Sequence, residues 1–321
     1  MDPGLPLPAA PPLLRRTRAI RGAAAVLLPF DDDGAIDWDG FEAHLVRIGT
    51  AGLLPAVNMD TGFAPVLTAA QRAEVLQVTR GAFGSGFIAG VLVDDHPGAA
   101  FDVEATRRGV AEVTTAGGVP ILFPSFGLAG LGEADVVAAL DAGTADCDAA
   151  FAFELGTMFH PAGRIFSLAT FAELLELPQF IGCKHSSLQR GAELDRLALR
   201  DARRPGFSVM TGNDLAIDLV CYGSDYLLGL ATFAPDAFAQ RDAAWAAGDE
   251  LGFLELNDLL QYLGQLSFRS PVPGYRHDAA MFLQLRGHLS SSTTHPSSPL
   301  RPEADRELLA DILRRLEALL R

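Results

Sequence analysis

The sequence predicts a (β/α)8 barrel followed by a C-terminal helical extension. Eight short apolar runs alternate with eight longer amphipathic stretches. The runs are continuously apolar, which is typical of strands whose two faces are both covered. Regular alternation of strand and helix gives a parallel sheet, and eight units allow that sheet to close into a barrel. An open doubly wound sheet is the alternative, but no G-x-G-x-x-G motif follows the first run, which argues against dinucleotide binding.

The predicted elements follow one another at regular spacing. The strands are expected at residues 22–30, 53–58, 86–94, 119–124, 149–155, 179–184, 207–211 and 225–230. Their helices are expected at 38–50, 68–83, 100–116, 132–146, 167–176, 188–202, 213–222 and 235–248. Further helical patterns lie at 250–267, 277–287 and 303–320. We therefore divide the chain into an N-terminal arm (1–20), a barrel (21–248) and a helical extension (249–321). The proline-rich arm has no basic residue ahead of its apolar stretch, which predicts a mobile segment rather than a signal peptide.

The composition limits the classes of partner. The chain has 321 residues, of which 49% are hydrophobic, and a net charge of −15. This acidity argues against binding to nucleic acid or to an acidic membrane surface. No apolar run reaches the roughly 18 residues that a membrane span needs. The three cysteines match no metal motif, which predicts a reduced, cytoplasmic protein without a metal or other cofactor.

One residue stands out from this composition. The chain has 25 basic residues, and Lys184 is the only lysine among them. Arginine keeps its proton in proteins and cannot serve as an amine nucleophile. Lys184 follows the apolar run QFIGC at the end of the sixth strand, and barrel enzymes carry their chemistry at these strand ends. A desolvated lysine has a lowered pKa and can condense with a carbonyl group, which is the function we predict for Lys184. The alternative is a lysine that caps the strand and pairs with a carboxylate.

Other strand ends carry polar or glycine residues. Glycine-bearing turns at Thr61-Gly62 and at Gly212 could offer backbone N–H groups to a substrate carboxylate, or could be turns only. Asp94, Asp95 and His96 follow the third strand and suggest a metal site. Adjacent residues on a regular strand cannot all face one ion, so this alternative is weak.

The order of these segments resembles the dihydrodipicolinate synthase and N-acetylneuraminate lyase superfamily of class I aldolases. The resemblance runs from about Arg21 to Pro235. GAAAVLLPFDDDGAIDWDGF is similar to the opening segment of the family, and VMTGND and YGSDYLLGLATFAP are similar to its last two strand segments. QFIGCKHSS resembles the segment that carries the Schiff-base lysine, and the match falls on Lys184.

The resemblance implies a barrel with a helical extension, assembled as a homotetramer or a smaller homo-oligomer. It implies a Schiff base between Lys184 and a 2-oxo acid such as pyruvate. It does not fix the reaction, because the family contains aldolases, lyases and sugar-acid dehydratases.

The sequence departs from the family at the residues that move protons. The carboxylate-binding G-T-T-G-E segment of the family aligns with Met59-Asp60-Thr61-Gly62-Phe63, so that its first threonine becomes Asp60. The tyrosine that the family carries after the fifth strand is absent here, where the strand ends in Phe153-Glu154. The position of the family's second tyrosine falls near Ser125-Phe126, which has no tyrosine either. All four tyrosines of the chain follow Lys184, so no small shift of the alignment restores the tyrosine relay.

Another group must then shuttle protons. Glu154 is the first choice, because a carboxyl group in a dry pocket can have a raised pKa. His160 is the second choice and Asp60 the third, and His185 stays possible. The predicted substrate-binding residues are Asp60, Thr61, Gly62, Phe126, Phe153, Arg164, Gly212 and Leu227. Arg164 is included as a carboxylate clamp. Phe63, Phe126 and Phe153 predict an apolar pocket for a substrate with an aromatic or aliphatic arm.

We therefore predict a lyase or aldolase-like enzyme that forms a Schiff base between Lys184 and a 2-oxo acid, with a proton shuttle that is not the family tyrosine. A sugar-acid dehydratase that uses the same lysine is one alternative. A catalytically altered barrel that only binds a ligand is another, motivated by the missing tyrosines.

Overall fold

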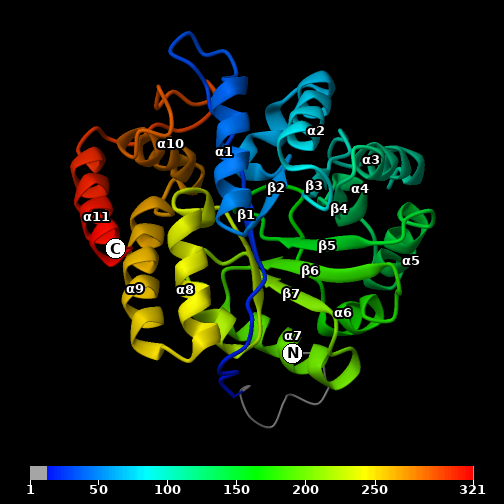
Figure 1. Cartoon of the computed structure of the whole chain (residues 1–321). Helices are drawn as coiled ribbons and strands as arrows, with labels where there is room; N and C mark the ends of the chain where they lie inside the picture. The colour runs from blue at the N-terminus through cyan, green and yellow to red at the C-terminus, as the bar shows by residue number, and fades with distance from the viewer. Residues whose placement is uncertain (1–12, 321) are drawn as a thin grey trace.

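Eight parallel strands form the closed barrel in the computed structural model, which describes residues 13–320 (Figure 1). The strands are β1 (Gly22–Ala25), β2 (Leu54–Val57), β3 (Ile88–Val91), β4 (Val119–Leu122), β5 (Ala150–Leu155), β6 (Phe180–Ser186), β7 (Ser208–Thr211) and β8 (Asp225–Leu228). Each strand pairs with the next in chain order, and β1 pairs with β8 to close the sheet. The predicted (β/α)8 barrel is therefore confirmed.

Helices surround the barrel and continue beyond it. They are α1 (Trp38–Thr50), α2 (Ala69–Phe83), α3 (Val103–Thr115), α4 (Phe126–Ala129), α5 (Glu133–Gly143), α6 (Leu168–Leu174), α7 (Arg190–Arg203), α8 (Pro235–Ala247), α9 (Glu250–Ser267), α10 (Tyr275–Leu285) and α11 (Asp305–Leu319). Helix α9 lies beside α8, and α11 packs against α9 and α10 (Figure 1). None of the helices described is long and apolar enough to cross a bilayer.

The prediction of an α-helix at residues 213–222 is wrong. This segment contains only a 3₁₀ helix, η3 (Ile217–Tyr222). The Asn213 side chain accepts a hydrogen bond from the Leu215 N–H at 3.0 Å, which holds the chain in a local turn. Gly223 then ends the segment with a φ of 113°, a conformation that favours glycine.

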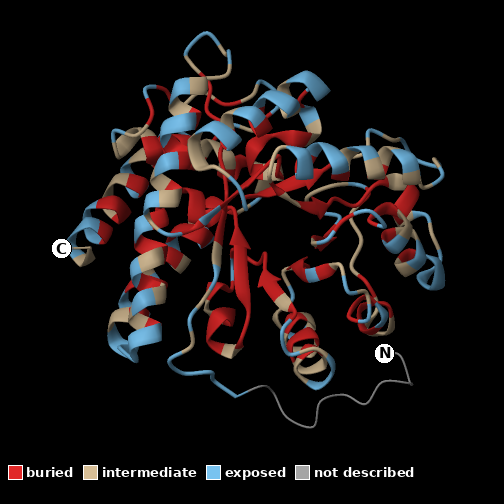
Figure 2. Ribbon diagram, turned by 45° about the vertical axis from the view of Figure 1, so that its right-hand side comes forward, coloured by how far each residue is buried: buried red, intermediate tan, exposed pale blue. Residues whose placement is uncertain are grey.

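Two apolar clusters stabilise the barrel on its two sides. Figure 2 shows that buried residues dominate the strands, whereas the helices alternate between buried and exposed residues. The cluster inside the barrel is small and includes Ala25, Ala56, Ile121 and Phe153. The larger cluster joins the outer faces of the strands to the helices and continues into α9, α10 and α11. Because this cluster is continuous, the helical extension shares the core of the barrel.

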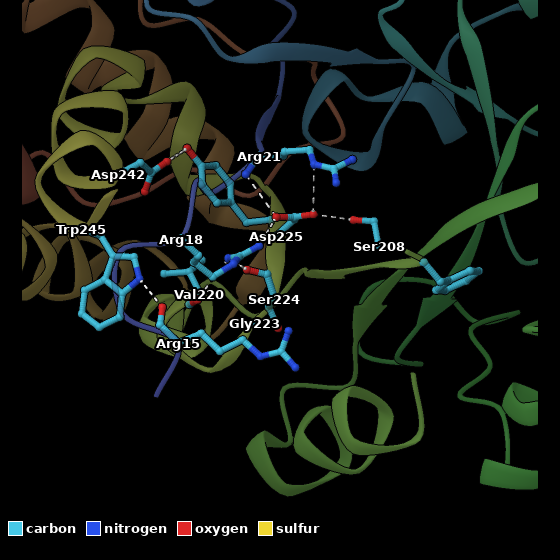
Figure 3. Close-up of polar contacts among 12 residues, drawn as sticks. Arg15, Arg18, Arg21, Ser208, Val220, Gly223, Ser224, Asp225, Asp242 and Trp245 are labelled. Carbon is cyan, nitrogen blue, oxygen red and sulfur yellow. Dashed lines mark hydrogen bonds and ion pairs between the residues drawn. The ribbon is translucent and has the colours of Figure 1, made fainter. Parts of the chain in front are cut away.

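The described part of the N-terminal arm is bound to the barrel (Figure 3). Arg18 donates hydrogen bonds to the carbonyls of Val220 and Ser224, and its guanidinium pairs with Asp225 at 2.5 Å. The Trp245 indole donates to the Arg15 carbonyl at 3.0 Å. The prediction of a mobile arm is therefore corrected for residues 15–20, and residues 1–12 lie outside the described residues.

Candidate active site

Lys184 points into the barrel from β6. Its backbone pairs with Phe153 of β5 and Met210 of β7, and the residue is 8% exposed. The Nζ atom lies 4.5 Å from the centre of the Phe153 ring. This buried amine is the feature that the sequence predicted at the end of the sixth strand.

Burial sets the protonation of this amine. Desolvation lowers the pKa of Lys184 to about 8, although the carboxylates of Asp214 and Asp60 oppose the shift. Burial also raises the pKa of Asp214, whose Oδ1 accepts a hydrogen bond from the Leu230 N–H at 2.7 Å. About a tenth of Lys184 is therefore an uncharged, nucleophilic amine at pH 7.

Gly212 makes room for the lysine side chain. A Cβ atom at this position would lie 2.7 Å from Cε of Lys184 and would overlap Oγ of Ser186. Gly212 also lines the lysine pocket, so its predicted place at the site is consistent with the geometry, but its role is steric. Ser186 is buried, and its hydroxyl has no hydrogen-bond partner within the described part of the chain.

The pocket at Lys184 is tight. Its volume is about 20 Å³, which is room for about one water molecule. The predicted residues Asp60, Thr61 and Phe153 line it. The remaining lining residues are Met59, Leu155, Phe159, Ser186, Gly212, Asp214, Gly229, Phe268 and Tyr275.

The sequence analysis missed Tyr275. It begins α10 in the helical extension, and it is 3% exposed. Its hydroxyl lies 2.8 Å from Oγ1 of Thr61 and donates to Oδ2 of Asp60 at 3.1 Å. The turn S-P-V-P-G-Y ahead of the helix was visible in the sequence, but nothing in it indicated that the ring reaches the barrel.

Gly229 and Phe268 seat the Tyr275 ring. A Cβ atom on Gly229 would lie 3.1 Å from the tyrosine ring and 3.2 Å from Oγ1 of Thr61. The Phe268 ring stacks on the other side, with ring centres 4.3 Å apart. Burial raises the pKa of Tyr275 well above its ordinary value, so the phenol is neutral.

The position of Glu154 corrects its predicted role as the proton shuttle. Glu154 pairs in register with His185, on the face of the strands opposite to Phe153 and Lys184. Its carboxylate accepts two hydrogen bonds from Arg196, at 2.5 and 2.6 Å, and one from His185 at 2.8 Å. Burial alone would raise its pKa, but Arg196 and His185 outweigh burial and lower the pKa to about 2. Glu154 therefore ties β5 and β6 to α7, and His185 belongs to the same network.

His160 and Phe126 lie at a second cavity. This cavity has a volume of about 110 Å³ and is also lined by Asp95 and Phe123. The Phe123 ring touches Phe153 with centres 5.0 Å apart, so these aromatic rings separate the two cavities. Burial lowers the pKa of His160. Neither His160 nor Phe126 lines the lysine pocket.

The structure also corrects the role predicted for Arg164. Its guanidinium donates to the carbonyls of Leu128 and Leu131 and pairs with Glu133 at 2.6 Å. These contacts occupy the guanidinium, so Arg164 braces the chain after α4 and is not free to clamp a substrate.

Three apolar or glycine residues lie away from the lysine pocket, contrary to prediction. Gly62 is buried against the Val26 carbonyl, and Leu227 is fully buried inside the barrel. The Phe63 ring packs on Phe30 with centres 5.4 Å apart. Phe63 has a φ of 61°, which turns its side chain into the outer cluster.

The residues of the alternative metal site have separate partners. Asp94 pairs with Arg72 at 2.5 Å, and Asp95 accepts hydrogen bonds from the N–H groups of Phe126 and Gly127. Within residues 13–320, no group of three His, Cys, Asp or Glu side chains could hold a metal ion.

The fold and the site together define a (β/α)8 barrel with a desolvated amine at the C-terminal end of β6. No protein-family model matches the chain. A curated relative, the 4-hydroxy-tetrahydrodipicolinate synthase of Parasynechococcus marenigrum (strain WH8102), is 28% identical over 313 residues, which are 95% of this chain and 97% of the relative.

Solved structures share the whole fold. Dihydrodipicolinate synthase from Rhodopseudomonas palustris superposes with a TM-score of 0.78 at 20% identity, over 94% of this chain and 99% of that chain. A prophage protein of the dihydrodipicolinic acid synthase family from E. coli K12, solved in complex with pyruvate, gives a TM-score of 0.77 at 17% identity, over 93% and 98% of the two chains. In sequence and in fold, the chain is therefore similar to dihydrodipicolinate synthases.

Proposed function

We propose that this protein is a lyase or aldolase of the dihydrodipicolinate synthase superfamily that acts on a 2-oxo acid through a Schiff base at Lys184. The observation that carries the proposal is the buried Lys184 amine, whose pKa burial lowers to about 8. The relative that is solved with pyruvate supports a substrate of this class.

The proposed reaction begins at the amine of Lys184. Its Nζ atom attacks the ketone carbon, and the resulting carbinolamine loses water to give a protonated imine. This cation withdraws electrons, so that a proton or a carbon substituent next to the former ketone can leave and its electron pair can form an enamine. Return of a proton and of water to these atoms releases the lysine.

Substrate entry requires side chains to move. A 2-oxo acid is larger than the single water molecule that the lysine pocket of about 20 Å³ can hold. Phe159 lines the pocket and comes from the turn after β5, so we take it as the side chain that moves aside. Beyond the Phe123 and Phe153 rings, the cavity of about 110 Å³ at His160 offers space for a further arm of the substrate, between aromatic rings and the carboxylates of Asp94 and Asp95.

Borohydride trapping tests the proposal. The folded protein is incubated with pyruvate and a panel of 2-oxo acids, reduced, and analysed by intact mass and peptide mapping. We expect one adduct on Lys184. The Lys184→Arg variant is the control, because it keeps the charge but has no side-chain amine. If no member of the panel forms an adduct with the folded protein, the proposal is wrong. Product analysis with the trapped acid then separates carbon–carbon cleavage from loss of water.

A further inference from the structure

We propose that Tyr275 and Asp60 form the proton route of the lysine pocket, with a tyrosine from the helical extension in place of the tyrosine that the barrel lacks. The inference rests on the proposed Schiff-base function. It assigns the missing proton shuttle to a pair of residues from α10 and η1 (Asp60–Gly62).

The hydrogen bonds give this pair a direction. The Tyr275 hydroxyl has one proton, which it donates to Oδ2 of Asp60 at 3.1 Å. The contact of 2.8 Å with Thr61 must then run the other way, with the threonine hydroxyl as donor. Tyr275 therefore keeps a lone pair that can accept a proton while its own proton passes to the carboxylate.

The route leads from a dry pocket toward solvent. Tyr275 and Thr61 are 3% and 2% exposed, and both line the pocket of Lys184. The Asp60 side chain is 21% exposed, and the Arg276 guanidinium lies 3.8 Å from its Oδ1. Arg276 also donates to the Asp60 carbonyl at 3.2 Å. The Asp60 carboxylate, which receives the proton in this route, therefore lies between the tyrosine hydroxyl and the Arg276 guanidinium.

Two residues on either side of the Tyr275 ring hold it in the pocket. Gly229 leaves the space that the ring occupies, since a Cβ atom there would press on both Tyr275 and Thr61. Phe268 stacks on the ring and holds its orientation. Gly229 and Phe268 therefore fix the position of the ring, and the ring position in turn holds the hydroxyl at Asp60 and Thr61.

The step that we assign is proton removal from the protonated imine. The C–H bond next to the imine carbon breaks, and its electron pair forms the enamine double bond and neutralises the nitrogen. The proton passes to Oη of Tyr275 as the tyrosine proton passes to Asp60. Asp60 becomes a neutral carboxylic acid and exchanges with water. The reverse sequence returns a proton to carbon.

Two readouts separate this route from the Schiff base itself. Borohydride trapping reports whether Lys184 and the pocket form the imine. Exchange of the methyl protons of pyruvate in D₂O, followed by proton NMR, reports whether protons move at carbon. Pyruvate is the probe in both assays, with acids from the panel in its place if they trap better.

For Tyr275→Phe we expect the same final yield of Lys184 adduct but a methyl exchange rate that is lower by about 100-fold, in the range of general acid–base catalysis. Phenylalanine keeps the ring and its stacking on Phe268. Asp60→Asn should lower the methyl exchange rate by the same factor with the tyrosine in place. This second variant tests the route if Tyr275→Phe does not fold. Tyr262→Phe is the matched control, because Tyr262 is 52% exposed on α9.

The outcomes are distinguishable. Normal trapping with normal methyl exchange in both variants would overturn the Tyr275–Asp60 route and leave the Schiff base intact. Absence of any adduct in the unaltered protein would overturn both. A loss of exchange in Tyr262→Phe would also overturn the assignment, because the effect would then not depend on the pocket.

Discussion

At the scale of single residues, the environment of Lys184 decides what the site can do. Its strand points it inward, Phe153 covers it, and burial lowers its pKa to about 8. The sequence alone indicated this residue, because a lone lysine at a strand end is visible without a structure. It could not indicate Tyr275, because the contact between α10 and the pocket joins residues far apart in the chain, and no local pattern encodes it.

The pH dependence of adduct formation follows from the lowered pKa of Lys184. The nucleophile is the uncharged amine, so the initial rate should rise with pH and level off above about 8. At pH 6 we expect about 1% of the plateau rate, because each pH unit below the pKa removes about tenfold of the amine. The check is a series of timed incubations at different pH values, all reduced under one common condition. A rate that still rises about tenfold per unit between pH 8 and pH 10 would indicate an ordinary exposed lysine.

The variant Gly212→Ala should disable Lys184 by steric contact. The added Cβ atom would lie 2.7 Å from Cε of the lysine, so the side chain must leave its position. We expect the initial rate of trapping to fall at least about tenfold, which corresponds to roughly 1.4 kcal/mol. Gly206→Ala is the matched control, because a Cβ atom there would have nothing within 4 Å. Equal rates in the two variants would show that Gly212 is only a turn residue.

At the scale of elements, the chain separates the reactive face of each strand from its structural face. The residues of β5 and β6 alternate, so that Phe153 and Lys184 face the pocket while Glu154 and His185 face α7. The order of strands and helices was predictable because periodicity is a local property. Successive residues of β5 point to opposite faces, so Phe153 faces the pocket and its neighbour Glu154 does not. The prediction for Glu154 rested on its place beside the lost tyrosine in the family alignment, which does not show this alternation. The 3₁₀ helix after β7 was missed because its cause is a side-chain turn at Asn213.

The variant Glu154→Gln should therefore affect stability and not proton transfer. It removes the charge that pairs with Arg196 inside the protein, where neither side chain is more than 4% exposed. Breaking a buried ion pair of this kind costs about 3–5 kcal/mol, which should lower the denaturation midpoint strongly. Glu173→Gln on the exposed side of α6 is the control. If the folded Glu154→Gln protein instead loses methyl exchange at unchanged stability, Glu154 is the proton shuttle after all.

The same network predicts an acid dependence. The pKa of Glu154 is lowered to about 2 in the folded protein, from an ordinary value of 4.5. A lowered carboxyl pKa stabilises the fold at every pH above the ordinary value, and this stabilisation is lost as the pH falls from about 4.5 toward 2. Urea denaturation across this range should therefore show a steeper loss in the unaltered protein than in Glu154→Gln. Parallel curves would contradict the assignment.

At the scale of the whole molecule, the barrel and the helical extension act as one unit. The outer apolar cluster runs from the strands into α9, α10 and α11, and the extension supplies Phe268 and Tyr275 to the lysine pocket. The sequence predicted that residues 249–321 form an extension, but it could not show that they complete the site. The homo-oligomeric state and the cytoplasmic location stay predictions.

Because the barrel and the helical extension share one apolar cluster, the full chain should unfold in a single cooperative transition. A shared core gives one calorimetric transition whose van't Hoff and calorimetric enthalpies agree, whereas independent domains give two.

A chain that ends at Gly248 should expose the outer apolar cluster and should not form a stable barrel, because Leu256, Leu260 and Phe282 would no longer cover it. A matched full-length variant, Leu260→Ala, keeps the chain intact and removes one fully buried contact, at a cost of about 2–5 kcal/mol. Its single transition should move to lower temperature as a whole, since the barrel and the extension lose stability together. A variant in which only part of the transition moves would show that the extension is a separate domain, and that Tyr275 reaches the pocket across an interface that can open.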